Sequence, residues 1–401
     1  MTKNKTLIII AILAMSTIGM VPGTVTPAIA NLAMAFPQVD PSLIMMLATL
    51  PSLLMVPGNL ISGAVTGKFI KFRTMIIFSF ILLITCGVAP YFLNDFIAIL
   101  ITRGVFGLVL GFIMPLGPAL IFGLIEGKDQ ANVMGLTGVF MNIGGIVFQM
   151  LGGVLCVISW RHTFLAHLVA VILLIAIVLW LPNPPEAPKA PAGAPAAPKV
   201  KMPIMIWVIG VLFGINFVLM MPVFLNMSLI IVGGNMGNAA SAGFVLMMNT
   251  VGGMAGGALF GKVFQKAGRF TLAVGLSIAA VGFALLATAG NLPLLTVGSA
   301  ITGFGFSLGM PAVMMAVGAM VPPHATPLAM AIMNSFSGVG GFVAPMIFAG
   351  IMGALKITWI RFPIVVGLVC IAIFVVIYTL INLRSKPAPS VSGGPPADMA
   401  Q

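Results

Sequence analysis

The sequence predicts an all-α membrane protein whose twelve transmembrane helices form two pseudo-symmetric six-helix bundles. Three observations lead to this prediction. Of the 401 residues, 60% are hydrophobic and only 6% are charged, whereas a soluble globular chain carries about 25% charged residues. Apolar stretches of about 20 residues, long enough to cross the hydrocarbon core as helices, recur along the whole chain. Short segments of the first half also recur in the second half.

The recurring segments lie about 195 residues apart. They pair residues 27–31 with 222–226, residues 63–68 with 257–262, and residues 144–145 with 340–341. A duplicated hydrophobic chain can build two similar bundles with a path between them, which is the plan of many secondary transporters. The alternating pattern of a membrane β-barrel is absent from the sequence.

The first bundle is predicted to occupy residues 1–181. Its first helix follows Lys3 and Lys5 and runs from about Leu7 to Phe36, which is too long for a signal peptide, so we expect it to be retained. Five further spans of membrane-crossing length are predicted at residues 43–66, 74–92, 96–124, 132–157 and 163–181.

The second bundle is predicted to occupy residues 204–384. The segment before it, residues 182–203, is rich in Pro and Ala and predicts an extended cytoplasmic linker. Residues 385–401 are rich in Pro, Gly and Ser and predict a disordered cytoplasmic tail. The six predicted spans of this bundle are residues 204–232, 239–260, 271–289, 292–321, 328–355 and 362–383.

The distribution of Lys and Arg predicts the orientation. With the amino terminus in the cytoplasm, 14 of the 18 basic residues fall on the cytoplasmic side, and only Arg161, Lys356 and Arg361 fall outside. This bias predicts a multi-pass protein of the cytoplasmic membrane with both termini inside. The net charge of +12 therefore reports topology, and no nucleic-acid partner is expected.

Glycine and basic residues follow the second predicted span in a pattern that is repeated in the second half. The pattern begins with Gly63, Gly67 and Lys68 in the first half. In the second half it begins with Gly257, Gly261 and Lys262. This resembles the loop motif of the major facilitator superfamily, except that Gly67 and Gly261 occupy its aspartate position. The resemblance covers about residues 7 to 384 and implies two six-helix halves and alternating access. The glycines predict close helix packing, and a gating role is the alternative.

The predicted fifth span carries two glycine pairs, Gly144-Gly145 and Gly152-Gly153, and Trp160-Arg161 follows it. This is similar to the fifth-helix motif of the drug:proton antiporter branch. Gln149 stands at the motif's proline, whereas the eleventh span keeps a proline, Pro345, after its own glycine pair. The resemblance implies antiport, and structural use of these residues is an equal alternative.

Arg103 is the one charge placed well inside a predicted span. It lies about eight residues, or roughly 12 Å, from the outer end of that span. A charge in hydrocarbon is costly, so we expect Arg103 to face a wet cavity or a partner; snorkelling to the outer surface is the alternative. An arginine in a fourth helix followed by glycines also resembles the family pattern.

The predicted solute site consists of polar residues within the spans. Each asparagine has the alternative of bonding a neighbouring helix. With one positive and no negative charge, this site favours neutral or weakly anionic solutes. The candidates are Thr26, Asn31, Arg103, Asn142, Gln149, Asn216, Asn226 and Asn334.

None of the six acidic residues falls within a predicted span. Proton coupling would therefore require a histidine, a carboxylate at a cavity mouth such as Asp40 or Asp95, or protons competing on the solute. Without such coupling the protein is a facilitator or an exchanger. Protons consequently remain an open partner beside the two expected ones, a small-molecule solute and the lipid bilayer.

The sequence predicts a monomeric secondary transporter that exports drug-like or metabolite compounds. The alternative is a facilitator, importer or exchanger of a small anionic metabolite that binds Arg103 and is not proton-coupled. An enzyme is not expected, because the spans lack paired carboxylates, a His/Cys metal cluster and a Ser/His/Asp set. No cofactor or metal is expected either.

Overall fold

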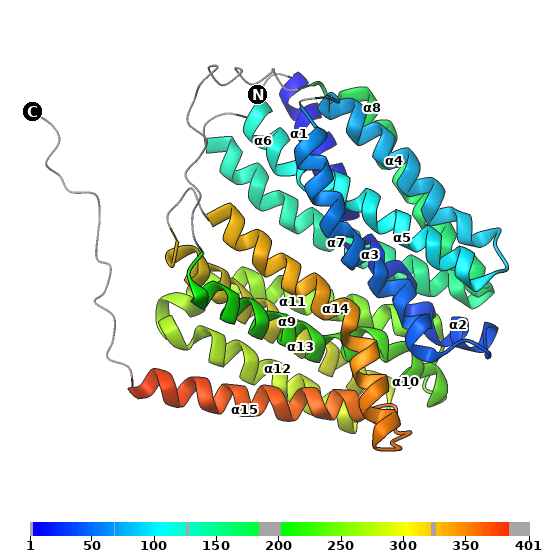
Figure 1. The fold of residues 1–401 in the computed structure, drawn as a ribbon, viewed down its shortest axis with the longest axis vertical. Helices are drawn as coiled ribbons and strands as arrows, with labels where there is room; N and C mark the ends of the chain where they lie inside the picture. The colour runs from blue at the N-terminus through cyan, green and yellow to red at the C-terminus, as the bar shows by residue number, and fades with distance from the viewer. Residues whose placement is uncertain (1–2, 68, 126–127, 184–201, 322–325, 385–401) are drawn as a thin grey trace, which may run out of the picture.

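The computed structural model describes residues 3–67, 69–125, 128–183, 202–321 and 326–384 of the chain. Its first half, in blue to teal in Figure 1, lies against a second half in green to red. The first half contains α1 (Lys3–Ser16), η1 (Thr17–Ala28), α2 (Ile29–Ala35), α3 (Pro41–Val65), α4 (Phe72–Val88), η2 (Ala89–Tyr91), α5 (Phe96–Ile113), α6 (Leu116–Leu124), α7 (Lys128–Ile158), η3 (Trp160–Leu168) and α8 (Val169–Trp180). The second half contains α9 (Ile204–Leu225), α10 (Met227–Gly233), α11 (Ala239–Ala267), η4 (Gly268–Phe270), α12 (Thr271–Thr288), α13 (Leu292–Ala319), α14 (Thr326–Ala354) and α15 (Phe362–Arg384).

The described residues contain eleven apolar helical stretches long enough to cross a membrane. One of them, Ala239–Thr288, is 50 residues long and holds both α11 and α12, with η4 between them. The all-helical membrane fold is therefore confirmed. The predicted linker and tail lie almost wholly outside the described residues.

Several predicted spans are not single α-helices. The first is divided into α1, η1 and α2, and η1 is a 3₁₀ helix of 12 residues that contains Pro22 and Pro27. Runs of 3₁₀ helix longer than a few residues are uncommon, and proline removes a backbone donor. Hydropathy predicts that this segment crosses the membrane, but it cannot detect the change of helix type.

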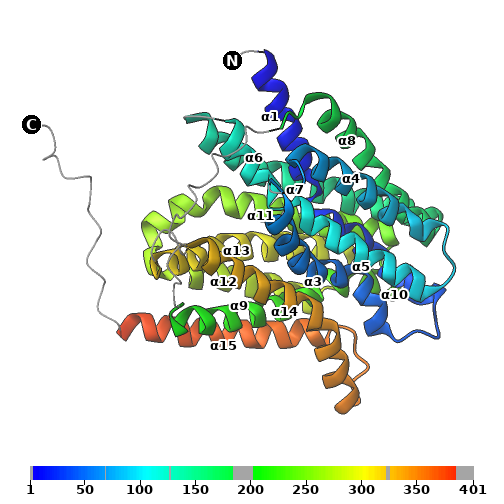
Figure 2. The same cartoon turned by 45° about the horizontal axis from the view of Figure 1, so that its top comes forward.

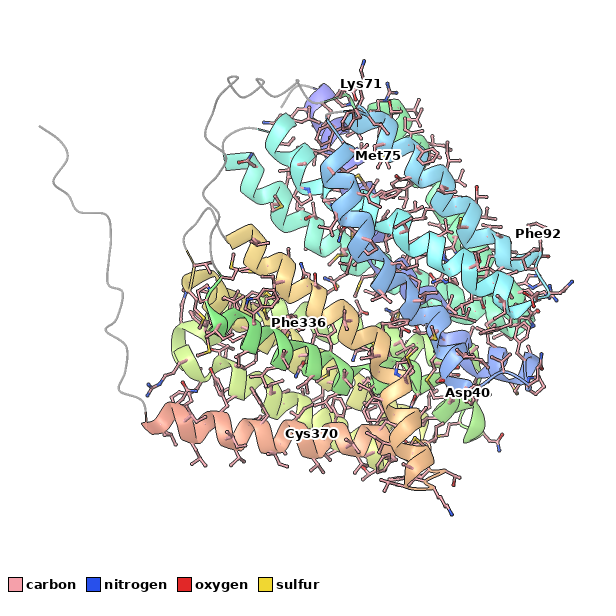
Figure 3. All side chains as sticks on the ribbon, viewed as in Figure 1. Asp40, Lys71, Met75, Phe92, Phe336 and Cys370 are labelled. Carbon is pink, nitrogen blue, oxygen red and sulfur yellow. The ribbon has the colours of Figure 1, made fainter. Side chains whose placement is uncertain are left out.

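The molecule has two opposite ends, a loop end and a terminal end. The loop end carries the connections at residues 36–40, 92–95, 234–238, 289–291 and 355–361. Asp40 and Phe92 both lie there (Figure 3). The terminal end carries the start of α1, the end of α8, the start of α9 and the end of α15. In Figures 1 and 2 the two halves come together toward the loop end, where α2 and α10 lie.

Each half has its own apolar core. One cluster of buried residues is drawn from residues 11–181 and includes Phe80 and Phe106, and another is drawn from residues 220–371 and includes Phe283. A third cluster joins the halves at the loop end, where Ile29 and Leu32 meet Leu225. The two halves are therefore packed independently and meet over a limited surface.

The two halves repeat the same helix contacts. A Cβ added to Gly107 of α5 would lie 2.3 Å from Cα of Pro51, and one added to Gly303 of α13 would lie 1.9 Å from the carbonyl oxygen of Asn249. These pairs are related by offsets of 196 residues between α5 and α13 and 198 between α3 and α11. The segment at 63–68 was predicted to match 257–262 at an offset of 194. The contacts give 198 for the same two helices, so the structural match between α3 and α11 differs from the sequence match by four residues, about one helical turn.

The helix starts at the loop end also repeat. Asp40 caps α3 by accepting from the backbone N–H of Ser42, and Asp95 caps α5 by accepting from that of Ala98. In the second half, Asn238 and Asn291 cap α11 and α13 in the same way. Side-chain acceptors at these positions satisfy amides that the first helical turn leaves unpaired.

Candidate functional site

The halves are joined at the loop end by a hydrogen-bonded serine. The hydroxyl of Ser228 on α10 donates to the carbonyl oxygen of Pro27 at 2.6 Å and accepts from the backbone N–H of Ala30 at 3.2 Å. Ser228 is fully buried. Because Pro27 disrupts the regular helix, these groups lie where a hydroxyl from the other half can reach them.

The two glycine pairs of α7 face two different neighbours. A Cβ on Gly144 or Gly152 would lie 1.8 or 2.0 Å from the carbonyl oxygens of Thr17 and Thr24 on η1, within the first half. A Cβ on Gly153 would lie 2.5 Å from the carbonyl oxygen of Ala239 on α11, in the second half. The first glycine of each pair thus holds α7 to its own half.

The second glycine of each pair comes near the other half, although the nearest atom to a Cβ on Gly145 would be Cβ of Met20 on η1, at 3.1 Å. Gly145 would place a Cβ 3.7 Å from the methyl group of Thr250, and Gly243 on α11 would place one 2.8 Å from the carbonyl oxygen of Gln149. The buried Gln149 side chain donates weakly to the hydroxyl of Thr250 at 3.4 Å, and its Oε1 has no partner. Backbones this close present a smooth surface along which one helix can shift against another.

The larger of two cavities lies between the halves at the loop end. Its volume is about 260 Å³. The first half contributes the start of α3, and the second half contributes α9, α10, α14 and the start of α15. Its lining is mainly apolar, and its polar residues are Asp40, Ser42 and Asn226.

A second cavity, of about 180 Å³, lies within the first half among α1, α5, α6 and α7. Three methionines, Met15, Met114 and Met141, line it together with Ser16 and Thr137. The hydroxyls of Ser16 and Thr137 each donate to a carbonyl of their own helix. The cavity therefore offers flexible thioethers and few free polar groups, which suits an apolar solute.

Arg103 is enclosed inside the first half and lines neither cavity. Its Nε donates to the carbonyl oxygen of Leu47 at 2.9 Å, and its Nη1 lies 3.5 Å from Nε2 of His167. The guanidinium carbon lies 4.4 Å from the centre of the Phe106 ring, and Nη2 has no partner. Arg103 therefore has partners within the protein, which is one of the two surroundings expected for it from the sequence. It does not snorkel to the surface, and it does not face a cavity in this conformation.

Comparison with known proteins places this geometry in a family. The family model of the Major Facilitator Superfamily matches residues 7–289 and 211–399. The chain belongs to the major facilitator superfamily. It is a secondary transporter that works by alternating access, and it is not an enzyme. No curated protein matches the chain.

Solved structures share the fold at low sequence identity. A bacterial homologue of the human lysosomal transporter Spinster, in an inward-facing and unoccupied conformation, matches with a TM-score of 0.75 and 16% identity over 97% of this chain and 100% of that one. The nucleoside transporter NupG gives 0.77 and 11% over 94% and 99%. A D-xylose-proton symporter gives 0.69 and 15% over 93% and 97%. At such identities these likenesses show the fold alone.

The transporter's remaining predicted solute residues do not form a single cluster. Asn142 donates to the carbonyl oxygen of Gly138 on its own helix at 2.9 Å, and Thr26 bonds the carbonyl of Gly23. Asn226 lines the larger cavity and donates to the carbonyl oxygen of Ile360 at 3.1 Å. Asn334 is exposed. Asn142 and Thr26 thus bond their own helices, and Asn226 bonds the connection at residues 355–361, so none of these three bonds joins an asparagine to a neighbouring helix.

Asn31 and Asn216 differ from the others. Each has a buried side-chain oxygen without a partner. A buried acceptor without a donor is costly, so these two atoms and Oε1 of Gln149 are the acceptors of the predicted set best placed to take a hydrogen bond from a solute or water.

The loop-motif glycines do not pack as expected. A Cβ on Gly63, Gly257 or Gly261 would meet nothing within 4 Å. These residues lie toward the terminal end of α3 and α11. Gly67 follows α3 with φ of +82°, which only glycine adopts easily, and so forms a turn. Lys68 lies outside the described residues, and Lys262 lies beside Gly261 in α11. Pro345 lies inside α14, which bends in Figures 1 and 2, and it also lines the larger cavity.

The sequence reasoning missed Ser228 and Thr250. Both are buried polar residues in apolar helices, and both lie where the halves meet. Ser228 follows Asn226 by two residues, so a search for every hydroxyl near the repeated proline motif would have found it.

Proposed function

We propose that this transporter exports a small, largely apolar organic solute across the cytoplasmic membrane. We also propose that the chain crosses that membrane twelve times. The division of the 50-residue stretch into α11 and α12 supports twelve. The basic residues support a cytoplasmic location for the terminal end and both termini. The two separate apolar cores support two six-helix units joined by the 182–203 linker.

One observation carries the proposal: the contacts between halves gather at the loop end. Ser228 bonds Pro27 and Ala30, Gly153 approaches Ala239, and farther along the same interface Gly338 of α14 lies against Ser52 of α3. Among the described residues, a Cβ on Gly63, Gly257 or Gly261 at the terminal end would meet nothing within 4 Å. In the proposed orientation, this is a carrier that is closed to the outside and open toward the cytoplasm.

The cavities support an apolar solute. The methionine-lined cavity of the first half lies among α1, α5 and α7, and the unpaired oxygens of Asn31 and Asn216 are further polar groups within the helices. The anionic-metabolite alternative requires a conformation in which Arg103 becomes accessible, because here the guanidinium is enclosed. The partial antiporter motif of α7 supports export.

The coupling proposal rests on the same motif. Asp40 and Asp95 cap helices at the loop end. We propose proton antiport in which a carboxylate at a cavity mouth or the solute itself carries the proton.

Transport by purified protein in proteoliposomes tests the proposal. Solutes found by a thermal-stabilisation screen of metabolites and drugs would be loaded inside, and efflux would be followed with and without an imposed pH gradient. We expect saturable efflux of the solute, and we expect an inward proton gradient, acidic outside the liposomes, to accelerate it. Saturable exchange indifferent to the gradient would remove antiport and leave a facilitator or exchanger. Failure of every hit to cross would remove the proposed transport of apolar solutes.

A further inference from the structure

We propose that the larger cavity, at the loop end between α3, α9, α10 and α14, is a binding site for small organic monocations. This site is distinct from the methionine-lined cavity within the first half, and the proposal concerns binding whether or not the ligand is transported.

Among the lining residues that the structure describes, Asp40 is the one that carries a charge. No Lys, Arg or His is among the lining residues. The carboxylate lies at the start of α3 and is exposed, so an entering ligand meets it first. Its Oδ1 accepts from the backbone N–H and the hydroxyl of Ser42, which are neutral donors and leave its negative charge uncompensated.

The polar groups of the lining offer acceptors and few donors. The Ser42 hydroxyl already donates to Asp40, so its remaining capacity is as an acceptor. The Asn226 amide nitrogen uses one of its two N–H groups on the carbonyl oxygen of Ile360, so it can offer its own carbonyl oxygen and one remaining N–H. Four lining residues are prolines, which have no backbone N–H: Pro41, Pro222, Pro345 and Pro363. An anion would find at most the second amide N–H of Asn226 and would meet the negative charge of Asp40, whereas a cation would find that charge and several acceptors.

The rest of the lining suits the organic body of such a cation. Phe348 contributes an aromatic ring, and ring faces attract cations. Met45, Met221 and Met352 contribute flexible, polarizable side chains. The volume of about 260 Å³ lies just below the roughly 300–1,000 Å³ of ordinary small-molecule sites, so a small aromatic ammonium ion fits and a large drug does not.

Equilibrium binding of benzyltrimethylammonium to the full-length protein in phosphatidylcholine nanodiscs tests the proposal. The key variant is Asp40→Asn, because asparagine caps a helix as well as aspartate and only the charge is lost. The matched control is Asp95→Asn, which removes the equivalent charge from the start of α5, outside the cavity. A second variant, Phe348→Leu, keeps the wall apolar and removes the ring.

We expect Asp40→Asn to weaken binding about five- to tenfold, the loss of one Coulomb interaction near the surface. Phe348→Leu should weaken it about threefold, and Asp95→Asn should leave it unchanged. Benzenesulfonate, an anion, should not bind. Neopentylbenzene is the uncharged isostere of benzyltrimethylammonium, and its affinity for the wild type should equal the affinity of benzyltrimethylammonium for Asp40→Asn. Equal binding by wild type and Asp40→Asn, equal losses in both aspartate variants, or no binding to wild type would each overturn the proposal.

Discussion

Replacing Ser228 with alanine should shift the transporter toward a state that is open at the loop end. In the closed state, this one hydroxyl satisfies the carbonyl oxygen of Pro27 and the N–H of Ala30. The alanine variant leaves both groups buried without their partner. In the open state, water can reach them, so the cost falls on the closed state alone.

The size of the shift can be estimated from the two lost hydrogen bonds. Hydrogen bonds between helices in membranes contribute about 0.6 kcal/mol each on average, and a buried unsatisfied group costs about 1–3 kcal/mol. The closed state of Ser228→Ala should therefore lose about 1–2 kcal/mol. Since 1.4 kcal/mol is a factor of ten, the ratio of open to closed molecules should rise about five- to thirtyfold.

Pulsed electron spin resonance between one label on each half measures this ratio. Gln38 and Gly290 are exposed positions in loop-end connections of the first and second halves. Cys370 is exposed and would be replaced by serine, whereas Cys86 and Cys156 are buried. The expected result is a larger fraction of long distances between the two labels.

Ser79→Ala is the matched control. Ser79 is also a fully buried serine of the first half, but its hydroxyl has no partner, so its removal orphans nothing. It should leave the distance distribution unchanged. If Ser228→Ala also left the distribution unchanged, or shortened the loop-end distances, Ser228 would not hold the halves together.

Three further predictions concern the first half. Gly144→Ala should lower the melting temperature, because its Cβ would lie 1.8 Å from a backbone oxygen of η1, whereas Gly138→Ala on the same helix meets nothing within 4 Å and should be neutral or stabilising by up to about 1 kcal/mol; thermal unfolding in detergent compares them, and equal losses would contradict the packing argument. Arg103→Gln should lower the melting temperature and slow transport of solutes of every charge alike, because the guanidinium is enclosed; selective loss of anion transport would instead support the anionic alternative. The Ser42 hydroxyl and then its backbone N–H lower the pKa of Asp40 below the ordinary aspartate value of 3.8, so its contribution to stability is complete above that value and is lost as the pH falls through the lower folded pKa; the melting-temperature difference between wild type and Asp40→Asn should be constant above pH 5 and change only below about pH 4, and a change near pH 7 would contradict this.

The sequence predicts the helices of this protein well, because hydropathy and length control what crosses a membrane. It also predicts the glycine pairs of α7 as packing residues, since glycine at that spacing permits close approach. It cannot assign a neighbour to each glycine. Which side of a helix faces η1 and which faces α11 depends on the rotation of α7, and no local pattern records that rotation.

The position of Arg103 shows the same limit. Its depth follows from counting residues along the span, and depth alone led us to expect a cavity or a partner. Its actual surroundings come from α3 and η3, where Leu47 and His167 lie 56 and 64 residues away in sequence. A guanidinium that is buried inside a bundle and one that lines a passage have the same sequence environment.

The duplicated half supplies a natural comparison for this buried charge. Ser299 lies 196 residues after Arg103, the same offset that relates Gly107 to Gly303 in the contacts of α5 and α13. Ser299 is also fully buried, its hydroxyl has no partner, and its carbonyl accepts from Asn249 at 2.9 Å. The second half therefore packs the equivalent helix crossing with no charge at all. The fold does not require a cation at this position, so any loss of stability in Arg103→Gln measures how far the first half has adapted to its own arginine.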